Sequence, residues 1–386
     1  MKNLYKYLPP FLADTFGFQE VIDVTDGMGI LDDCAPYKGK VSRTDIAEPY
    51  RGSRMVCSNI RMEDVIGGTK AKLLDAFRRD CRRFDPAPAF VLLTNSPVAS
   101  MIGTDLEDVC DTVTAESGIP AASVDLAGHK YYDHGLSETM LALAKLLVEP
   151  AGEKIPHSIN LIGGNAIDWS AQTVREIRTW ITKRGFQIIS QWGSPERAAN
   201  LKQAAKAELN LVLTVSGLAT AKWMQREFGI PYIAAAPFGT DWCARLRCAM
   251  CYPDQRDVLE LSADPNPPHI LIVGEQLTAN AIRNTLQHAY KMGGTHVATF
   301  FTFEKSLSRP GDKRLKSEDD LKNLLHSGTY DLVIGDADLS VLAPEGVRWI
   351  DLPHGAVRID YEGEGFPSLI YSNLNFWLDS VLADKE

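Results

Sequence analysis

The stretch 209-LNLVLTVSGLATAKWMQREFGIPYIAAAPFG-239 contains one complete strand–helix–strand unit. Its first part, 209–215, is a nearly continuous apolar run of strand length, which is typical of a strand covered on both faces. The pattern over 219–229 predicts an amphipathic helix that ends at Gly229, and 231–236 is a second apolar run. Because parallel strands need a crossover of this kind, the stretch predicts a parallel sheet with a right-handed connection.

The same alternation continues on both sides of this unit. Apolar runs of strand length are separated by segments with helical periodicity, many of which open with Ser or Thr and close with Gly. The further predicted strands are 89–94, 158–163, 187–192, 269–274, 296–301, 331–335 and 347–352, and the further predicted helices are 68–84, 137–148, 170–185 and 276–294. This repetition predicts an α/β protein.

Two seams interrupt the alternation, at 149-EPAGEKIPHS-158 and at 252-YPDQRDVLELSADPNPPH-269. The second seam is rich in Pro and Asp, as domain linkers often are. The seams divide the chain into 1–152, 156–252 and 266–386. We predict that each segment forms a doubly wound, Rossmann-like α/β domain with a parallel sheet.

Composition sets broad limits on function. The chain has 386 residues, a formal net charge of −10 and 45% hydrophobic residues, which are values of an ordinary globular protein. An acidic surface argues against nucleic acid or an anionic membrane as a partner. We find no secretory signal and no apolar stretch of about 18 residues, so we predict no membrane span. Seven cysteines, an odd number, indicate reduced thiols and a cytoplasmic location.

Motifs for nucleotide binding and for nucleophilic catalysis are absent. The glycine turns 162-IGGNAID-168 and 273-VGEQLTAN-280 each follow a strand, but neither is a dinucleotide or P-loop fingerprint. The sequence also lacks GxSxG and HExxH. We therefore expect no ATP site on this chain.

Two segments of the first domain carry a family resemblance. In 57-CSNIRMEDVIGGTKAKLLDAFRRD-80 and 89-AFVLLTNSPVASMIGTDLEDV-109, an acidic residue precedes a double Gly, and a helix, a buried strand and an Ile-Gly-x-Asp turn follow. This order resembles the first domain of the nitrogenase component 1 family, and 209–239, 269–276 and 331–339 resemble its second and third domains. The resemblance implies three Rossmann-like domains around a central cleft.

The family holds an iron–sulfur cluster at a subunit interface, and the resemblance suggests candidate ligands here. Cys34 matches one family cysteine, while Asp32 and Asp33 replace glycines of its turn, and Ser96 lies beside the position of a later cysteine. One thiolate cannot hold a cluster that normally takes four. Three alternatives remain open. Two copies of Cys34 meet across a twofold axis with Asp or Ser ligands, a different subunit supplies the other cysteines, or the cluster has been lost.

A second cysteine group is 243-CARLRCAMC-251, in which Cys243, Cys248 and Cys251 have the spacing C-x4-C-x2-C. This is part of the plant-type ferredoxin spacing, so we consider these three cysteines as metal or cluster ligands. Packing in a helix, or redox reactivity, is the alternative.

The resemblance also indicates groups near the cleft. Thr214 lies where the nitrogenase cofactor would need a cysteine, which argues against that cofactor, and Gly239 lies where the second domain faces the cleft. His354 is in the third domain, and His129 and His134 follow a predicted strand in 128-GHKYYDHGLSE-138. We expect these three histidines to act as proton donors or ligands, with a hydrogen-bonded loop as the alternative.

The leading hypothesis is a subunit of a nitrogenase-like oxidoreductase. It would receive electrons from an ATP-hydrolysing iron protein through an iron–sulfur cluster of the 4Fe–4S type, held by this chain or shared between subunits. Its substrate would be a small molecule or a tetrapyrrole-like compound, and its partner a second copy or another component 1-type subunit. The alternatives are a non-catalytic metallocluster scaffold or carrier and a clusterless α/β ligand-binding protein.

Overall fold

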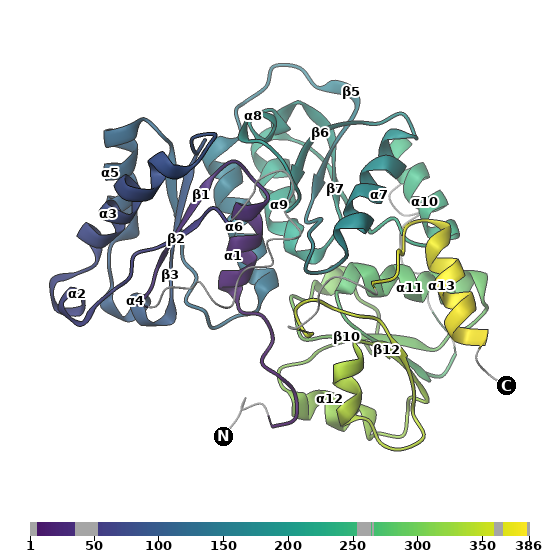
Figure 1. The fold of residues 1–386 in the computed structure, drawn as a ribbon. Coiled ribbons are helices and arrows are strands. Elements are labelled where there is room, and N and C mark those ends of the chain that lie inside the picture. The colour runs from purple at the N-terminus through teal and green to yellow at the C-terminus, as the bar shows by residue number, and fades with distance from the viewer. Residues whose placement is uncertain (1–5, 35–52, 253–263, 265, 359–365, 384–386) are drawn as a thin grey trace.

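A computed structural model of the chain describes residues 6–34, 53–252, 264, 266–358 and 366–383 (Figure 1). Three all-parallel sheets follow one another along the chain, each with helices packed around it. The second sheet begins at Ile155, one residue before the predicted segment 156–252, and the predicted bounds of the three domains stay a prediction. The prediction of three doubly wound α/β domains is confirmed.

The first sheet has the strand order β2-β1-β3-β4. All five residues of β1 and of β3 are buried, which explains why these strands are apolar on both faces. The strands are β1 (Met28–Asp32), β2 (Met55–Cys57), β3 (Val91–Asn95) and β4 (Ala121–Val124). The helices are α1 (Asp14–Asp23), α2 (Met62–Gly67), α3 (Lys70–Asp80), η1 (Cys81–Arg83), α4 (Pro97–Ile102), α5 (Leu106–Ser117) and α6 (Tyr132–Leu147).

The second sheet repeats this topology with the order β6-β5-β7-β8. Its strands are β5 (Ile155–Ile162), β6 (Gln187–Trp192), β7 (Ala207–Val212) and β8 (Tyr232–Ala234). Its helices are α7 (Ala171–Thr182), α8 (Ala198–Leu201), η2 (Ala204–Lys206), η3 (Val215–Gly217), α9 (Leu218–Phe228) and α10 (Thr240–Cys251).

The third sheet has the order β11-β10-β9-β12-β13. Its strands are β9 (Ile270–Val273), β10 (Thr295–Thr299), β11 (Lys313–Arg314), β12 (Leu332–Gly335) and β13 (Arg348–Asp351). Its helices are α11 (Gln276–Ala289), η5 (Lys305–Leu307), α12 (Glu318–Leu325), η6 (Ala337–Leu342) and α13 (Ser372–Ala383).

Strand order reverses once in each sheet, between β1 and β3, between β5 and β7, and between β9 and β12. In open parallel sheets, ligands bind beyond the carboxyl ends of the strands at such reversal points. The fold therefore directs attention to three places, which are the segments that follow β1 and β3, β5 and β7, and β9 and β12.

Both ends of the described chain cross between domains. The backbone amides of Lys6, Tyr7 and Leu8 donate hydrogen bonds to the carboxylate of Glu318 in the third domain. At the other end, the segment before α13 returns to the second domain, where Tyr371 N donates to Pro237 O at 3.0 Å. These crossings tie the domains together in addition to their linkers.

Within the described residues, no helix is both long and apolar enough to cross a membrane. The cytoplasmic location stays a prediction.

The helices α1 and α6 pack side by side in the first domain (Figure 1) with their backbones almost in contact. Glycines make this possible, because a Cβ atom at Gly17 would overlap Tyr132 O and one at Gly135 would overlap Asp14 O. The two α-helices can lie this close only because each has a glycine, which carries no side chain, at the point of contact.

We predict that Gly135→Ala lowers the free energy of unfolding by about 1–3 kcal/mol or more, because the obstructing atom is backbone and cannot rotate away. Urea denaturation of both proteins measures the difference. Gly152→Ala is the matched control, since nothing lies within 4 Å of a Cβ atom built there. Equal losses in the two variants would contradict the close approach.

Candidate functional site

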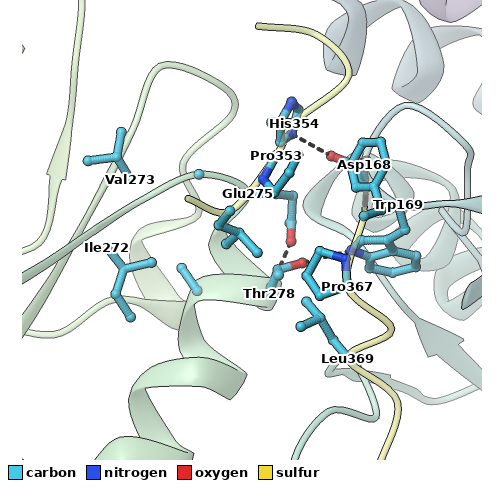
Figure 2. A pocket seen from close by; sticks show the side chains of 14 residues that line it. Asp168, Trp169, Ile272, Val273, Glu275, Thr278, Pro353, His354, Pro367 and Leu369 are labelled. Atoms are coloured by element: carbon cyan, nitrogen blue, oxygen red, sulfur yellow. Dashed lines mark hydrogen bonds and ion pairs between the residues drawn. The ribbon is translucent and has the colours of Figure 1, made fainter. Parts of the chain in front are cut away.

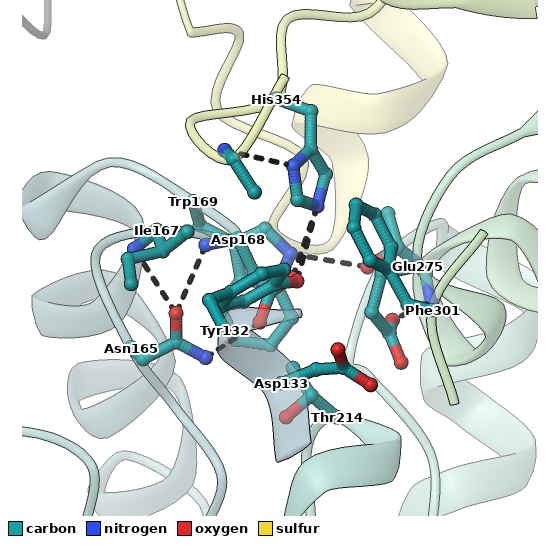
Figure 3. Close-up of polar contacts among 12 residues, drawn as sticks. Tyr132, Asp133, Asn165, Ile167, Asp168, Trp169, Thr214, Glu275, Phe301 and His354 are labelled. Carbon is teal, nitrogen blue, oxygen red and sulfur yellow. Dashed lines mark hydrogen bonds and ion pairs between the residues drawn. The ribbon is translucent and has the colours of Figure 1, made fainter. Parts of the chain in front are cut away.

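Asp168 lies at the junction of the three domains and is contacted from all of them (Figure 3). Its Oδ1 accepts hydrogen bonds from the Tyr132 hydroxyl at the start of α6 and from His354 Nε2 at 3.1 Å. Its Oδ2 accepts from Asn165 Nδ2 at 2.6 Å. The residue is only 5% exposed, so these donors replace the water that the carboxylate has lost.

The glycine turn after β5 places Asp168 for these contacts. Asn165 Oδ1 accepts from the backbone amides of Ile167 at 3.0 Å and Asp168 at 2.9 Å, which closes the turn on itself. The turn that follows this strand thus presents a carboxylate at the reversal point of the second sheet.

His354 has a defined tautomer. Its Nδ1 accepts a hydrogen bond from the Ala356 amide at 3.2 Å, so this nitrogen carries no proton. The proton of the neutral ring is therefore on Nε2, which donates to Asp168. Asp336 holds the His354 backbone amide at 2.7 Å, and the Phe301 ring stacks on the imidazole at 4.8 Å.

Glu275 is a second buried carboxyl group at the junction. Its Oε2 caps α11 by accepting from Thr278 N at 2.8 Å, and its Oε1 accepts from Val215 N at 3.0 Å in the second domain. Burial raises its pKa to about 7, and the negative charge of Asp168 acts in the same direction. Glu275 can thus gain and lose a proton near neutral pH.

Asp133 is the third buried carboxyl group. Its Oδ2 accepts hydrogen bonds from Thr302 N at 2.6 Å and Thr302 Oγ1 at 2.5 Å, which links α6 to the third domain. Burial raises its pKa above the ordinary value.

A cavity of about 20 Å³ adjoins Asp168, Glu275 and His354 (Figure 2). This is room for about one water molecule. Three side chains that can carry protons therefore line a small cavity whose other walls are mainly apolar, and such groups can hold and exchange protons.

The structure brings one predicted histidine to this junction and leaves two outside. His354 is in the site, whereas His129 is exposed. The ring of His134 contacts Lys130 at 2.8 Å and Glu138 at 3.9 Å. The helix α6 begins at Tyr132, so His134, two positions later, lies on another face of the helix and points away from the junction.

Sequence reasoning did not select Tyr132, Asp168 or Glu275, which the structure brings to this junction. A signal for each was available, because Tyr132 lies in the same polar loop as His134, and Asp168 and Glu275 belong to glycine turns after strands.

Thr214 and Gly239 have structural contacts. Thr214 Oγ1 donates to Gly163 O at 2.7 Å and joins the turns after β5 and β7. Gly239 adopts a φ of 83° before α10, and a Cβ atom there would overlap Thr285 Oγ1. These are structural contacts, and a cofactor-binding role of either residue stays a prediction.

Cys34 lies directly after β1 at the carboxyl edge of the first sheet and is exposed. Its amide donates to Asp33 Oδ1 at 2.7 Å, and Cys57 Sγ donates to Asp33 O at 3.4 Å. Desolvation, supported by the contact with Asp33, raises the pKa of the Cys34 thiol. The thiol would release its proton on binding a metal ion.

The remaining groups at this edge have other partners. Asp32 accepts from Ser58 Oγ at 2.6 Å with one oxygen and from Thr69 Oγ1 at 2.5 Å with the other. Ser96 Oγ accepts from Ala99 N at 3.3 Å and caps α4. The structure thus brings Cys34, Asp33 and Ser96 to the carboxyl edge of the first sheet, but the Ser96 hydroxyl caps α4.

Cys243, Cys248 and Cys251 all lie on α10 and do not converge. Cys243 is in the hydrophobic core, where burial raises its pKa to about 12, whereas Cys251 is exposed at the helix end. Across the part of the chain that the structure describes, no three His, Cys, Asp or Glu side chains are grouped to hold a metal ion. The predicted metal site on this helix therefore gains no support.

Comparison with known proteins identifies the family. A model of "Nitrogenase component 1 type Oxidoreductase" matches residues 33–251. The chain belongs to this nitrogenase component 1 family.

Among relatives of this component 1 chain, the iron-molybdenum cofactor biosynthesis protein NifE of Nostoc sp. is 30% identical over 183 residues, 46% of this chain and 37% of that protein. The nitrogenase molybdenum-iron protein alpha chain of Clostridium pasteurianum is 28% identical over 207 residues, 51% and 37% of the two chains. The matches thus span well under half the length of these relatives.

A solved structure described as nitrogenase Cp1 at pH 6.5 superposes with a TM-score of 0.75 at 13% identity. The superposition covers 100% of this chain and 95% of that one. At this identity the likeness supports the component 1 fold.

An iron–sulfur cluster, which the family implies, does not fit the described residues of one chain alone. At the Cys34 edge, Asp32 already has a hydrogen-bond donor on each oxygen and Ser96 caps a helix. The thiols of Cys34 and Cys57 remain, which is fewer than the four ligands that a cluster normally takes. Any cluster here needs ligands from outside these residues.

We predict that Glu275→Gln changes how stability depends on pH. In the wild type, folding raises this pKa from 4.5 to about 7, so the folded state keeps a proton that the unfolded state loses between these values. Wild-type stability therefore falls as pH rises through this window, by about 3 kcal/mol in total.

Glu275→Gln has no carboxyl group to lose this proton, so its unfolding free energy should not fall in this way. Relative to the wild type, the unfolding free energy of the variant should therefore rise by about 3 kcal/mol between pH 5 and 8. Urea denaturation at four pH values measures it. Glu345→Gln, at an exposed position, is the control and should follow the wild type. Parallel curves for wild type and Glu275→Gln would show that the carboxyl group does not hold its proton.

Proposed function

We propose that this chain is a subunit of a nitrogenase-like reductase and that it shares an iron–sulfur cluster with a second subunit at the carboxyl edge of its first sheet. Cys34 is the ligand that this chain contributes. The observation that carries the proposal is the exposed thiol of Cys34 at the strand-order reversal of that sheet.

The surface around Cys34 supports a subunit contact. Ile60 N donates to Asp33 O just before α2, and Ser96 N donates to Asp32 O just before α4, so both helices start beside the thiol. These helices expose large apolar side chains. Met62 is 79% exposed, Ile66 90% and Met101 88%. Exposed apolar groups that gather in this way mark interaction surfaces.

A second copy of this chain or another component 1-type subunit would cover this surface and bring the missing ligands. Two copies of Cys34 related by a twofold axis provide two thiolates, and a different subunit could provide three. The electron donor in this proposal is a separate ATP-hydrolysing iron protein, in agreement with the lack of a phosphate-binding motif in the sequence.

The domain junction has a different role in the proposal. Reduction consumes protons as well as electrons, and Glu275, Asp168 and His354 are among the residues that line one cavity in which a single water fits. A cavity of about 20 Å³ holds no tetrapyrrole. In this arrangement the junction supplies protons, and a substrate binds beside it or after the domains move apart.

A second candidate function is a non-catalytic metallocluster scaffold or carrier. Similarity to NifE, which is a cofactor biosynthesis protein, favours it. A scaffold would release its cluster to an acceptor protein without consuming substrate, whereas a reductase would keep the cluster through turnover.

We predict that Cys34→Ala abolishes cluster binding. The wild type, purified without oxygen as the assembled complex, should contain about two irons and two acid-labile sulfides per chain if two copies share one four-iron cluster. The variant should lose this iron and the visible absorption, because the other thiol at this edge, Cys57, is only partly exposed and already donates to Asp33 O.

Cys251→Ala is the matched control, since it removes another exposed thiol on a different domain. It should keep the iron of the wild type. Iron lost from Cys251→Ala but kept in Cys34→Ala would move the cluster to α10. A colourless wild-type complex without iron would leave the clusterless ligand-binding alternative.

A further inference from the structure

Two arginine side chains are buried in the third domain, at its contact with α10. Arg283 on α11 is fully buried and Arg309, in the loop before β11, is 8% exposed. Arginine stays charged in proteins, so each buried guanidinium needs an acceptor for its donors and a negative charge nearby.

The carboxylate of Asp312 accepts hydrogen bonds from both arginine residues. Arg283 Nη1 donates to both oxygens of Asp312, at 2.7 and 2.9 Å. The same carboxylate also accepts the backbone amides of Val297 at 2.8 Å and Arg309 at 2.7 Å. Asp312 is thus fully used, and it is bonded to the backbone of Arg309 rather than to its guanidinium.

Several buried donors of this group have no acceptor. They are Arg283 Nε, Arg309 Nε, Arg309 Nη1 and Asn284 Nδ2. The Arg309 guanidinium is bonded through Nη2 to a neutral group, the Gln287 amide oxygen at 3.0 Å. A buried donor without an acceptor costs about 1–3 kcal/mol, and more when it is charged.

The unpartnered donors belong to neighbouring elements. Asn284 lies beside Arg283 on α11 and accepts at its Oδ1 from Arg245 of α10 at 3.0 Å. Burial lowers the pKa of Arg309 to about 10. The positive charges of Arg283 and Arg245 act in the same direction, and the negative charges of Asp264 and Asp312 oppose them. The group lies where α11 meets α10, and these two helices lie next to one another in Figure 1.

We propose that the unpartnered donors of Arg283, Asn284 and Arg309 bind a small oxyanion with a phosphate or carboxylate group. Such an anion accepts several hydrogen bonds at once, which the donors left unpaired by Asp312 require. Water can also accept hydrogen bonds, but those that a guanidinium donates to a charged oxyanion are stronger.

The test is titration of the full chain with inorganic phosphate, and separately with acetate, at constant ionic strength set with chloride. Isothermal calorimetry measures affinity, and thermal unfolding measures stabilisation. We expect one of the two anions to bind, and the anion that binds identifies the ligand class. Arg309→Gln should weaken binding about tenfold or more, because it removes a charged donor.

Arg314→Gln, at an exposed position on β11, is the matched control and should bind like the wild type. A second variant, Asn284→Asp, places a carboxylate where the unpartnered amide nitrogen lies. It should raise the unfolding midpoint without added anion and remove the effect of phosphate or acetate. This result does not depend on Arg309→Gln folding normally.

The proposal is overturned if neither anion binds, or if chloride stabilises the wild type as much as phosphate and acetate do. It is also overturned if Arg309→Gln binds with wild-type affinity. In these cases water satisfies the buried donors.

Discussion

The arrangement of the three domains depends on one buried carboxylate. Asp168 has lost its water and must find donors within the protein, and it finds them on Tyr132 of the first domain, Asn165 of its own turn and His354 of the third. Hydrogen bonds to a charged group contribute about 1.5–3 kcal/mol each, and a buried charge left unpaired costs more. The carboxylate is satisfied only when all three domains are in place.

Sheet topology explains why these groups meet. Asp168 follows β5, Glu275 follows β9 and His354 follows β13, so all three come from segments beyond the carboxyl ends of parallel strands. Such ends lie at one edge of a sheet, and the second and third sheets turn these edges toward each other. Packing them together buries several acidic groups in a small volume, which keeps the pKa of Glu275 near neutrality.

Two separate regions of this chain have features of a functional site, and they differ in character. The junction is closed, polar and filled by its own side chains, and Thr214 is used there for a structural hydrogen bond. The Cys34 edge is open, with an exposed thiol and exposed apolar helices. A closed region suits proton transfer, whereas an open one suits contact with another subunit. In the proposed function the two regions therefore divide the work of a reductase.

The sequence by itself determined the class of fold, because buried parallel strands leave long apolar runs and crossover helices leave a 3.6-residue period. It did not predict β1, β2, β4 or β11. β2 and β11 have only three and two residues, and β1 and β4 are short strands of sequence MGILD and AASV, which leave no comparable apolar run. It also indicated His354, which stands after a predicted strand.

Only the tertiary structure decided which polar groups meet. Spacing gives the period of α6, but not which face of that helix turns toward another domain, so Tyr132 rather than His134 reaches Asp168. The spacing of Cys243, Cys248 and Cys251 suits a metal loop as well as a helix, and the helix α10 separates their thiols. Contacts between residues more than a hundred positions apart depend on how the domains pack, and the local sequence pattern carries no record of that packing.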